Sequence, residues 1–440
     1  MKFNICAFSG PSLRYGRSGL EKVRRTFSLA FRKPPLTPQG EGGTICIALL
    51  LTFLLLAFPV HADDRLTVVL AGDTGLNASG APLDARGGWK GGRLVTAAEA
   101  LEGIGPWLRG DVVFANLESV VTDRNDIPAR EKMFVFRMHP QGAREFAEAG
   151  INVFSLANNH ALDYGTRGAG ETLAHVAAAP GLRAWPGLGR TRDEAMRPHV
   201  FEMRGLTVAV SAVGNAGGGL PARAGHAGML QERVDFAEVA ARLKAEAADL
   251  RILSVHYGRE FDPLTDAADI ERFRRVAAGG GATIVAGHHA HVAKGVEISG
   301  SHLVAYGLGN FLHLGTQNMA RFDICRDFGL LLRVGLARGE AGLAVETVEV
   351  VPLTGMHLRV TPMGGEAARL RLEVLNYLGG RLDGADARGL RFRPQADGSG
   401  LWCAAGAGDA RCAGWEEPAA SAREAEIVAA CGRVVTRGNF

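Results

Sequence analysis

The chain lacks a large excess of charge of one sign, and it lacks an internal repeat. It is not poor in apolar residues either, so none of these features assigns it to a special class of protein. The formal net charge of +3 comes from residues 1–62, which hold eight basic and two acidic residues; the 41 basic and 44 acidic residues of 63–440 leave that part at −3. This balance excludes the general basicity of nucleic-acid-binding proteins, so we expect no nucleic-acid partner. Hydrophobic residues make up 47% of the 440 residues, as in a globular protein with a large core and an accessory region.

Long apolar runs are also scarce, and residues 45–58 form the single clear one. The run is shorter than the roughly 20 residues of a membrane-spanning helix, and basic residues precede it. Val60 and Ala62 then occupy the small-residue positions of a signal-peptide cleavage site. We therefore predict that residues 1–62 are a cleaved leader and that the protein is exported, to the periplasm or another extracytoplasmic compartment. If the leader stays uncleaved, residues 45–58 would anchor the chain.

Cysteine usage agrees with export. Four cysteines remain beyond the leader, Cys325, Cys403, Cys412 and Cys431, and an even number is consistent with two disulfides in an oxidising compartment. Cys403 and Cys412 enclose a short Gly/Ala-rich loop and are the favoured local pair. Four unpaired thiols are the alternative, because the pairing of four cysteines does not follow from sequence.

Beyond the leader, short apolar runs alternate with helical patterns. Most of the runs are continuously apolar, which is typical of strands covered on both faces. The alternation predicts an α/β fold in which helices flank a central sheet. The expected strands are Leu66–Ala71, Val112–Ala115, Val153–Leu156, Thr207–Val213, Ile252–Val255, Thr283–Ala286 and Leu303–Tyr306, and the expected helices are Leu94–Leu108, Gln141–Ala149, Val234–Ala248 and Ala267–Ala278.

The pattern changes after Phe311. Leu330–Leu336 and Leu343–Val351 surround a short polar turn and predict a hairpin of longer strands that closes a domain spanning residues 63–363. Residues 364–440 follow as a smaller extension with a helical segment and a Cys-containing tail.

Residues able to carry chemistry follow the strands at their carboxyl ends. In α/β sheets, ligands gather in the crevice outside these ends, so parallel strands would bring such groups onto one rim. Aspartate, glutamate, asparagine and histidine together suit Mn²⁺, Fe²⁺ or Zn²⁺ and not a thiolate site. The groups concerned are Asp73, Asn116 with Glu118, Asn158-Asn159-His160, His256 with Arg259 and Glu260, His288-His289-Ala290-His291 and Asn310.

Each group also has a purely structural interpretation. Asp73 could cap a turn, His256 could be a buried and satisfied histidine, and Asn310 is expected to hold a turn. The three imidazoles of residues 288–291 are harder to explain without a metal, since they would repel one another when protonated. Because the structural interpretation requires several coincidences at equivalent strand ends, a shared site is favoured.

These motifs, in their order, resemble the CapA family, the poly-γ-glutamate capsule synthesis proteins, which are similar to calcineurin-like metallophosphoesterases. The resemblance extends from about Leu66 to Phe311. It rests on Gly72-Asp73, Asn116-Leu117-Glu118, Ala157-Asn158-Asn159-His160-Ala161-Leu162-Asp163-Tyr164-Gly165, His256-Tyr257-Gly258-Arg259-Glu260, Gly287-His288-His289-Ala290-His291 and Tyr306-Gly307-Leu308-Gly309-Asn310-Phe311.

The resemblance implies a four-layer metallophosphoesterase-like sandwich of two mixed sheets flanked by helices, with the small C-terminal extension added. It also implies a site for one or two divalent ions (Mn²⁺, Fe²⁺ or Zn²⁺), with His160 as proton donor. The implied ligands are Asp73, Glu118 as the bridging carboxylate, Asn159, His256, His289 and His291. His288 is an alternative to His289, which the spacing favours.

Two departures from the phosphoesterase pattern bear on the metal site. Those enzymes carry a histidine two residues after the first aspartate, where this chain has Gly75, and their second block normally offers aspartate, where it has Glu118. One of two metal positions would therefore be weaker.

The remaining assignments concern acid catalysis and substrate. Asp163 is placed to orient His160 if a helical turn begins there. Candidates for holding an anionic polymer or a phosphoester are Asn116, Lys132, Arg137, Arg259 and Glu260. Two hypotheses stay open: an exported metallohydrolase acting on phosphoester, amide or γ-glutamyl bonds, and a non-catalytic polyanion-binding subunit of a membrane polymer synthase.

The leader assignment predicts the N-terminus of the mature protein. When the full chain is expressed in an exporting host, the secreted form should begin at Asp63, because Val60 and Ala62 define the cleavage site. Intact-mass measurement of the exported protein checks this. A full-length chain recovered from the membrane fraction would contradict cleavage and favour an anchor formed by residues 45–58.

Overall fold

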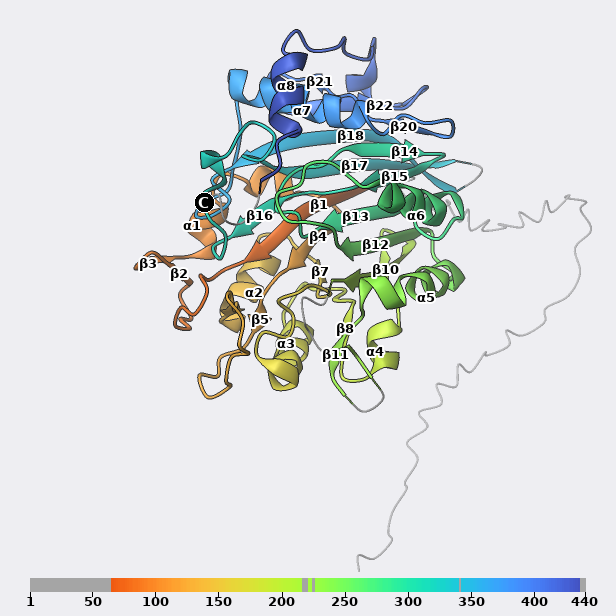
Figure 1. Cartoon of the computed structure of the whole chain (residues 1–440). Helices are drawn as coiled ribbons and strands as arrows, with labels where there is room; N and C mark the ends of the chain where they lie inside the picture. Colours follow the sequence, from red (N-terminus) through yellow and green to blue (C-terminus); the bar gives the residue numbers. More distant parts are fainter. Residues whose placement is uncertain (1–64, 216–220, 224–225, 340–341, 436–440) are drawn as a thin grey trace, which may run out of the picture. The chain divides into compact units, whose positions relative to one another are not determined.

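The computed structural model describes residues 65–435 except 216–220, 224–225 and 340–341 (Figure 1). The predicted leader, with its apolar run at residues 45–58, lies outside the described residues, so cleavage and anchoring stay predictions. None of the helices in the described ranges combines the length and the apolar character needed to cross a bilayer.

Two large sheets form the centre of the protein. The first has the strand order β21 (Arg393–Pro394), β22 (Gly400–Cys403), β18 (Gly342–Thr354), β17 (Gly329–Gly339), β1 (Arg65–Gly75), β4 (Val112–Leu117) and β7 (Val153–Ser155), with β16 (Asn310–His313) also paired to β1 and β19 (Thr361–Pro362) to β18. The second has the order β20 (Ala387–Gly389), β14 (Val296–Ser299), β15 (His302–Ala305), β13 (Ile284–His288), β12 (Leu250–His256), β10 (Leu206–Gly214) and β9 (His199–Met203).

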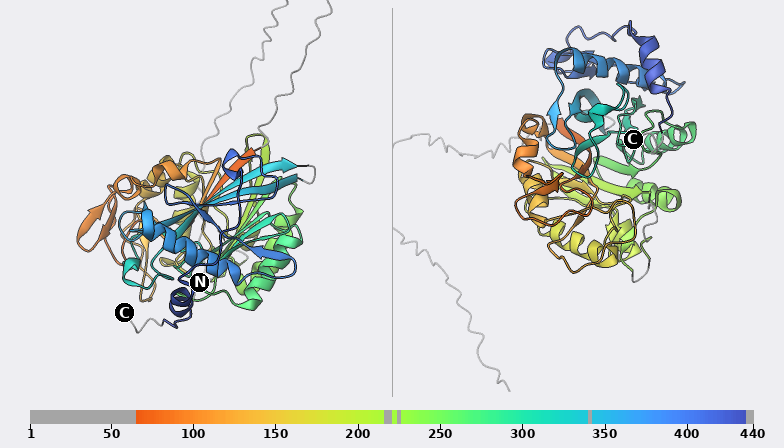
Figure 2. Two further views of the ribbon diagram at one scale, coloured as in Figure 1. Left: turned by 90° about the horizontal axis from the view of Figure 1, so that it is seen from above. Right: turned by 60° about the vertical axis from the view of Figure 1, so that its left-hand side comes forward.

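Helices cover the outer faces of both sheets, which gives four layers (Figure 2). Along β1, Val68 and Leu70 point into a core shared with the second sheet, whereas Val69 and Ala71 point into a core under the helices. Both faces of this strand are therefore buried, which explains its continuous apolar sequence. On the first sheet the covering helices are α1 (Ala97–Leu101), α2 (Pro140–Glu148) and α3 (Gly165–Ala177); on the second they are α5 (Glu232–Ala245) and α6 (Ala267–Ala278).

The predicted fold class is confirmed. All seven predicted strands are present, and the predicted hairpin is the antiparallel pair β17 and β18. The expected helix Leu94–Leu108 is wrong in extent: α1 ends at Leu101 and a separate 3₁₀ turn runs from Gly105 to Leu108. Thr96 caps the start of α1 by accepting a hydrogen bond from the backbone amide of Glu99, and Pro106 lies in the first turn of the 3₁₀ helix. The segment therefore forms two short helices in place of one long helix.

The C-terminal extension completes the core between the sheets. Helix α7 (Gly365–Gly380) contributes Leu372 and Leu375 to that core, and β22 and β20 extend the first and second sheets respectively (Figure 1, blue). Two disulfides are present, Cys403–Cys412, as predicted, and Cys325–Cys431, which ties helix α8 (Glu424–Cys431) to the segment before β17.

The strand directions decide where the functional side chains lie. Strands β1, β4 and β7 run parallel in the first sheet, and β10, β12, β13 and β15 run parallel in the second. Asp73 pairs in register with Asn116 on one side and with Asn310 on the other. In the second sheet His256 pairs with His288. The carboxyl ends of both sheets thus bring the predicted residues together, as expected for parallel strands.

The close approach of β1 to the segment before β16 yields a stability prediction. A Cβ on Gly72 would lie 1.9 Å from the carbonyl oxygen of Gly309, which accepts a hydrogen bond from the amide of Asp73. Gly72→Ala should therefore destabilise the protein by about 1–3 kcal/mol, as overpacking does. Equilibrium denaturation of residues 63–440 measures the loss.

The matched control is Gly170→Ala in α3, where an added Cβ meets nothing within 4 Å. This change should be neutral or stabilising by up to about 1 kcal/mol, because alanine favours helix more than glycine does. Equal effects of the two substitutions would contradict the packing argument.

Candidate metal centre

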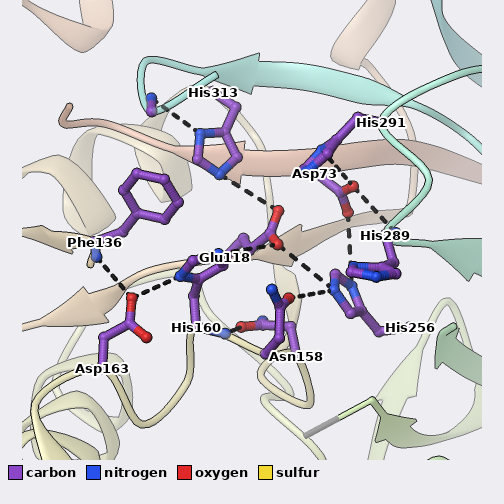
Figure 3. A network of polar contacts seen from close by, with 12 residues as sticks. Asp73, Glu118, Phe136, Asn158, His160, Asp163, His256, His289, His291 and His313 are labelled. Carbon is purple, nitrogen blue, oxygen red and sulfur yellow. Dashed lines mark hydrogen bonds and ion pairs between the residues drawn. The ribbon is translucent and has the colours of Figure 1, made fainter. Parts of the chain in front are cut away.

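Two fully buried carboxylates lie at the centre of the site (Figure 3). Asp73 ends the straight part of β1, and Glu118 follows β4; neither has any exposed surface. Isolated buried charges are strongly unfavourable, so a pair of like charges at this depth requires cations beside it.

Histidines from the second sheet face these carboxylates. His256, at the end of β12, places Nε2 3.5 Å from Glu118 Oε1 and 2.7 Å from Asn159 Oδ1. His291 places Nδ1 3.4 Å from Asp73 Oδ2. Two groups of potential ligand atoms result, each with all members within 4.8 Å: Asp73, Glu118 and His291 form the first position, and Glu118, His256 and His289 form the second.

The turn after β13 places two neighbouring histidines differently. His289 belongs to the second position with Glu118 and His256, whereas His288 lies under Asp73, with Nδ1 3.5 Å from Asp73 Oδ1. His289 and His291 have φ of 87° and 58°, in the left-handed region that non-glycine residues rarely adopt. Such strain persists where the surrounding structure imposes it, and it is concentrated at functional sites.

The donor set fits a divalent ion. Both carboxylate oxygens of Glu118 are buried and lack a hydrogen-bond partner among the described residues, and the same holds for His289 Nδ1. Buried polar atoms normally find a partner, so these atoms point to a ligand between them. Oxygen and imidazole donors without thiolate suit Mn²⁺, Fe²⁺ or Zn²⁺.

Burial and mutual charge set the protonation of the metal-free centre. Burial raises the pKa of Glu118 to about 7, and the charge of Asp73 adds to the effect. Burial opposes the charged form of Asp73 as well, but contacts with His288 and His291 hold its pKa well below the usual value. Burial alone would lower the pKa of His291, yet the carboxylates of Glu118 and Asp73 raise it to about 10. Burial, and then the charge of His291, lowers the pKa of His289 to about 4.

His160 lies at the edge of the centre and is held in place by Asp163. Its Nδ1 is 2.6 Å from Asp163 Oδ2, and its Nε2 faces Glu118 Oε1 at 3.9 Å. The turn between the two residues is closed by the amide of Asp163 donating to the carbonyl of His160, as the predicted orienting role requires. Asp163 also accepts hydrogen bonds from Lys132 Nζ at 2.6 Å and from the amide of Phe136 at 2.7 Å.

A cavity of about 420 Å³ opens beside His160 and His291. Glu260, a predicted substrate contact, is among the residues that line it. Most of the remaining wall is apolar, and Lys90 supplies a cation. The lining residues outside the centre are Lys90, Met133, Phe134, Phe136, Glu260, Phe261, Gly315, Thr316, Gln317 and Met319.

The wall of this cavity does not include the other four predicted substrate contacts. Asn116 is fully buried and donates to Asp73 Oδ1 at 2.8 Å, so it supports a proposed ligand. Lys132 is engaged with Asp163 and the carbonyl of Asn159. Arg137 stacks over a tyrosine ring, and Arg259 pairs with Asp262 beside a neighbouring cavity. Asn116 thus contacts the centre itself, Lys132 is linked to it through Asp163, and Arg137 and Arg259 are held by other partners. A substrate-binding role for these four residues stays a prediction.

His313 is a residue of the site that sequence reasoning missed, and Asn310 is one that it placed on the rim without a role in the centre. Asn310, expected to hold a turn, instead places Oδ1 2.8 Å from His291 Nδ1. His313 is fully buried, and its Nε2 lies 3.4 Å from Glu118 Oε2. Both belong to β16, whose four-residue length gives little periodicity, and only its pairing with β1 brings it to the centre. Asn158 supports the neighbouring strand end, because it donates to the carbonyl of Leu117 at 2.8 Å.

The sequence of the domain that carries this centre matches a known family. Residues 67–314 match the model of the bacterial capsule synthesis protein family PGA_cap, which is more than half of the chain. The chain belongs to this family. Its matched region holds every proposed metal ligand and the His160–Asp163 pair.

Curated relatives in the same family are similar over part of their length. The chain is 28% identical over 206 residues to the PGA biosynthesis protein CapA of Bacillus subtilis, which is 46% of this chain and 53% of that protein. It is 30% identical over 213 residues to a probable polyglutamine synthesis accessory protein of Mycobacterium tuberculosis, 46% of this chain and 55% of that protein. The chain therefore spans about half the length of the curated relatives that it matches.

A solved structure with a similar arrangement is a calcineurin-like phosphoesterase of Bacillus subtilis. The TM-score is 0.37 at 12% sequence identity, and the similarity covers 64% of this chain and 88% of that one.

The raised pKa values predict how metal affinity depends on pH. With the pKa of His291 near 10 and that of Glu118 near 7, a metal must displace one proton above pH 7 and two below it. As the pH is lowered, the Mn²⁺ affinity of residues 63–440 should therefore fall about tenfold per pH unit just above pH 7 and about a hundredfold per unit below pH 7. Calorimetry in buffers of different ionisation enthalpy measures both affinity and proton release.

The control for this measurement is Glu118→Gln, which removes the group that titrates near pH 7. Its weaker binding should fall by no more than about tenfold per unit decrease in pH, without the steeper two-proton range below pH 7, because only His291 is left to release a proton. A pH-independent affinity in the parent protein would contradict the proposed ligand set.

Proposed function

We propose that this protein is an exported metal-dependent hydrolase that acts in the synthesis or export of an anionic capsule polymer such as poly-γ-glutamate. Membership of the PGA_cap family and the printed functions of the relatives support the biological process. The arrangement of His160 beside the metal centre supports the reaction type. The bonds that would be cleaved are phosphoester, amide or γ-glutamyl bonds.

The observation that carries the proposal is the orientation of His160. One ring nitrogen is held by Asp163 at 2.6 Å, while the other faces the proposed bridging residue Glu118. The carboxylate at Nδ1 fixes the orientation of the ring, so that Nε2 is directed at the centre.

Each of the chain's groups has a defined task in this mechanism. Asp73, Glu118, Asn159, His256, His289 and His291 would hold the metal. The chemistry that a bound divalent ion supplies is activation of water and polarisation of the scissile bond. His160 gives its Nε2 proton to the leaving oxygen or nitrogen, which prevents a high-energy anion from departing. Asp163 fixes the ring, and Lys132 fixes Asp163 in turn.

The substrate would enter through the cavity beside His160. Glu260 and Lys90 supply one charge of each sign at its wall, and aromatic and methionine side chains supply the rest. A polymer carrying carboxylates would place the bond to be cleaved at the centre while its backbone and methylene groups lie along the apolar wall. Association with a membrane polymer synthase is part of the same proposal and is supported by the accessory role printed for the mycobacterial relative.

His160→Ala tests the catalytic role. In Mn²⁺-loaded protein of residues 63–440, the rate of phosphodiester or poly-γ-glutamate cleavage should fall by about 10²- to 10⁴-fold, the usual contribution of a general acid. The amount of bound metal should not change, because His160 lies outside both ligand groups. The measurements are turnover and metal content on the same samples.

His199→Ala is the matched control, since His199 lies on edge strand β9, outside the cavity and outside the groups of potential metal ligands. It should leave turnover unchanged. If the parent protein binds poly-γ-glutamate but neither it nor His160→Ala shows turnover on either substrate, the hydrolase is excluded and a polyanion-binding role replaces it.

A further inference from the structure

His313 occupies the space left by the absent side chain at Gly75. The two residues are partners in the parallel pairing of β1 and β16. A Cβ built on Gly75 would lie 3.3 Å from His313 Cε1 and 3.5 Å from Nδ1. The imidazole therefore fills the position into which a longer residue 75 would project, and it reaches the same centre from another strand.

The surroundings of His313 fix which ring nitrogen carries the proton. The backbone amide of Gly315 donates a hydrogen bond to Nδ1 at 3.0 Å, so Nδ1 must present a lone pair. In a neutral imidazole the proton is then on Nε2. Nε2 is buried, has no hydrogen-bond partner among the described residues and lies 3.4 Å from Glu118 Oε2 (Figure 3).

The ring has little freedom to adopt the opposite orientation. Phe136 packs against it edge-on, with ring centroids 5.0 Å apart. Gly315 is so close that a Cβ there would lie 2.6 Å from His313 Cε1 and 2.4 Å from a ring atom of Phe136. This close approach allows the Gly315 amide to reach Nδ1.

A histidine that ligates a metal through Nε2 needs the reverse arrangement, with Nδ1–H donated to a carbonyl or carboxylate. We propose that His313 is a positioning residue: it gives its Nε2–H to Glu118 Oε2 and holds the bridging carboxylate, and it is not a metal ligand. The group of Asp73, Glu118 and His291, which does not include His313, then keeps three protein donors. The remaining coordination positions are free for water or substrate.

The role rests on the metal centre of the proposed function, but the position of the proton can be measured without metal. In protein labelled with ¹⁵N-histidine, two-bond ¹H–¹⁵N spectra distinguish protonated from unprotonated ring nitrogens. In metal-free residues 63–440, His313 should carry its proton on Nε2, and Nε2 should stay protonated when Mg²⁺ or Zn²⁺, which are diamagnetic, is added. His199, on edge strand β9, provides a reference signal of the same tautomer, because its Nδ1 accepts a hydrogen bond from the amide of Trp185.

Metal binding tests the positioning role. His313→Ala should weaken Zn²⁺ and Mn²⁺ binding about 10- to 100-fold, as loss of a residue that orients a ligand does, with the number of ions per chain unchanged. His313→Gln, whose amide nitrogen can reach Glu118 in place of Nε2, should recover most of this loss. His199→Ala is the matched control and should bind metal like the parent protein.

Three results would overturn the proposal: a proton on Nδ1 of His313 in the metal-free protein, loss of Nε2–H with one ion fewer in His313→Ala, or unchanged affinity in that variant. If His313→Ala does not fold, the Gln variant and the spectra of the parent protein decide between the two roles. If the parent protein binds no metal, the proposed hydrolase fails. The spectrum of the metal-free protein still shows whether His313 directs Nε2–H at Glu118.

Discussion

The burial of Asp73 and Glu118 side by side is the constraint on which the rest of the site depends. Two carboxylates without solvent would repel each other strongly, and the protein surrounds them with imidazoles on the side of the second sheet. In the metal-free protein His291 carries the compensating proton, and the pKa of Glu118 rises to about 7. A divalent ion bound by these residues would replace the protons, so the repulsion that costs stability in the metal-free centre would favour metal binding.

The four-layer fold offsets the energetic cost of burying these charges. Strands β1 and β4 deliver the carboxylates at the edge of one sheet, and β12 and β13 deliver histidines at the edge of the other, while the large apolar core between the sheets stabilises both. The C-terminal extension adds to the same core through α7 and is joined by the Cys325–Cys431 disulfide. The precision of the centre thus comes from rigid strands, and the left-handed conformations of His289 and His291 are held by this framework.

Much of the fold and of the proposed ligand set was predictable because the signal is local. Continuously apolar runs such as Val153–Leu156 identified strands buried on both faces, and polar residues directly after them identified the rim. The extent of the helix at Leu94–Leu108 was not predictable from its apolar pattern, because a cap at Thr96 and a second start at Pro106 divide it. The positions of the basic side chains were not predictable for a different reason: long basic side chains pair with a nearby carboxylate or ring, as Arg137 and Arg259 do.

The sequence by itself determined where the strands lie, which polar residues follow them and which kinds of ligand atom a metal could find there. These properties depend on residues that are neighbours in the chain. Only the tertiary structure decided that His289 and not His288 joins Glu118, because the choice depends on a left-handed turn. It also brought in His313, which is separated from Gly75 by more than half of the chain and reaches Glu118 only because β16 pairs with β1. A local sequence pattern does not indicate which distant strands pair. The residue that fills the space beside Gly75 is therefore decided by the pairing of β1 with β16.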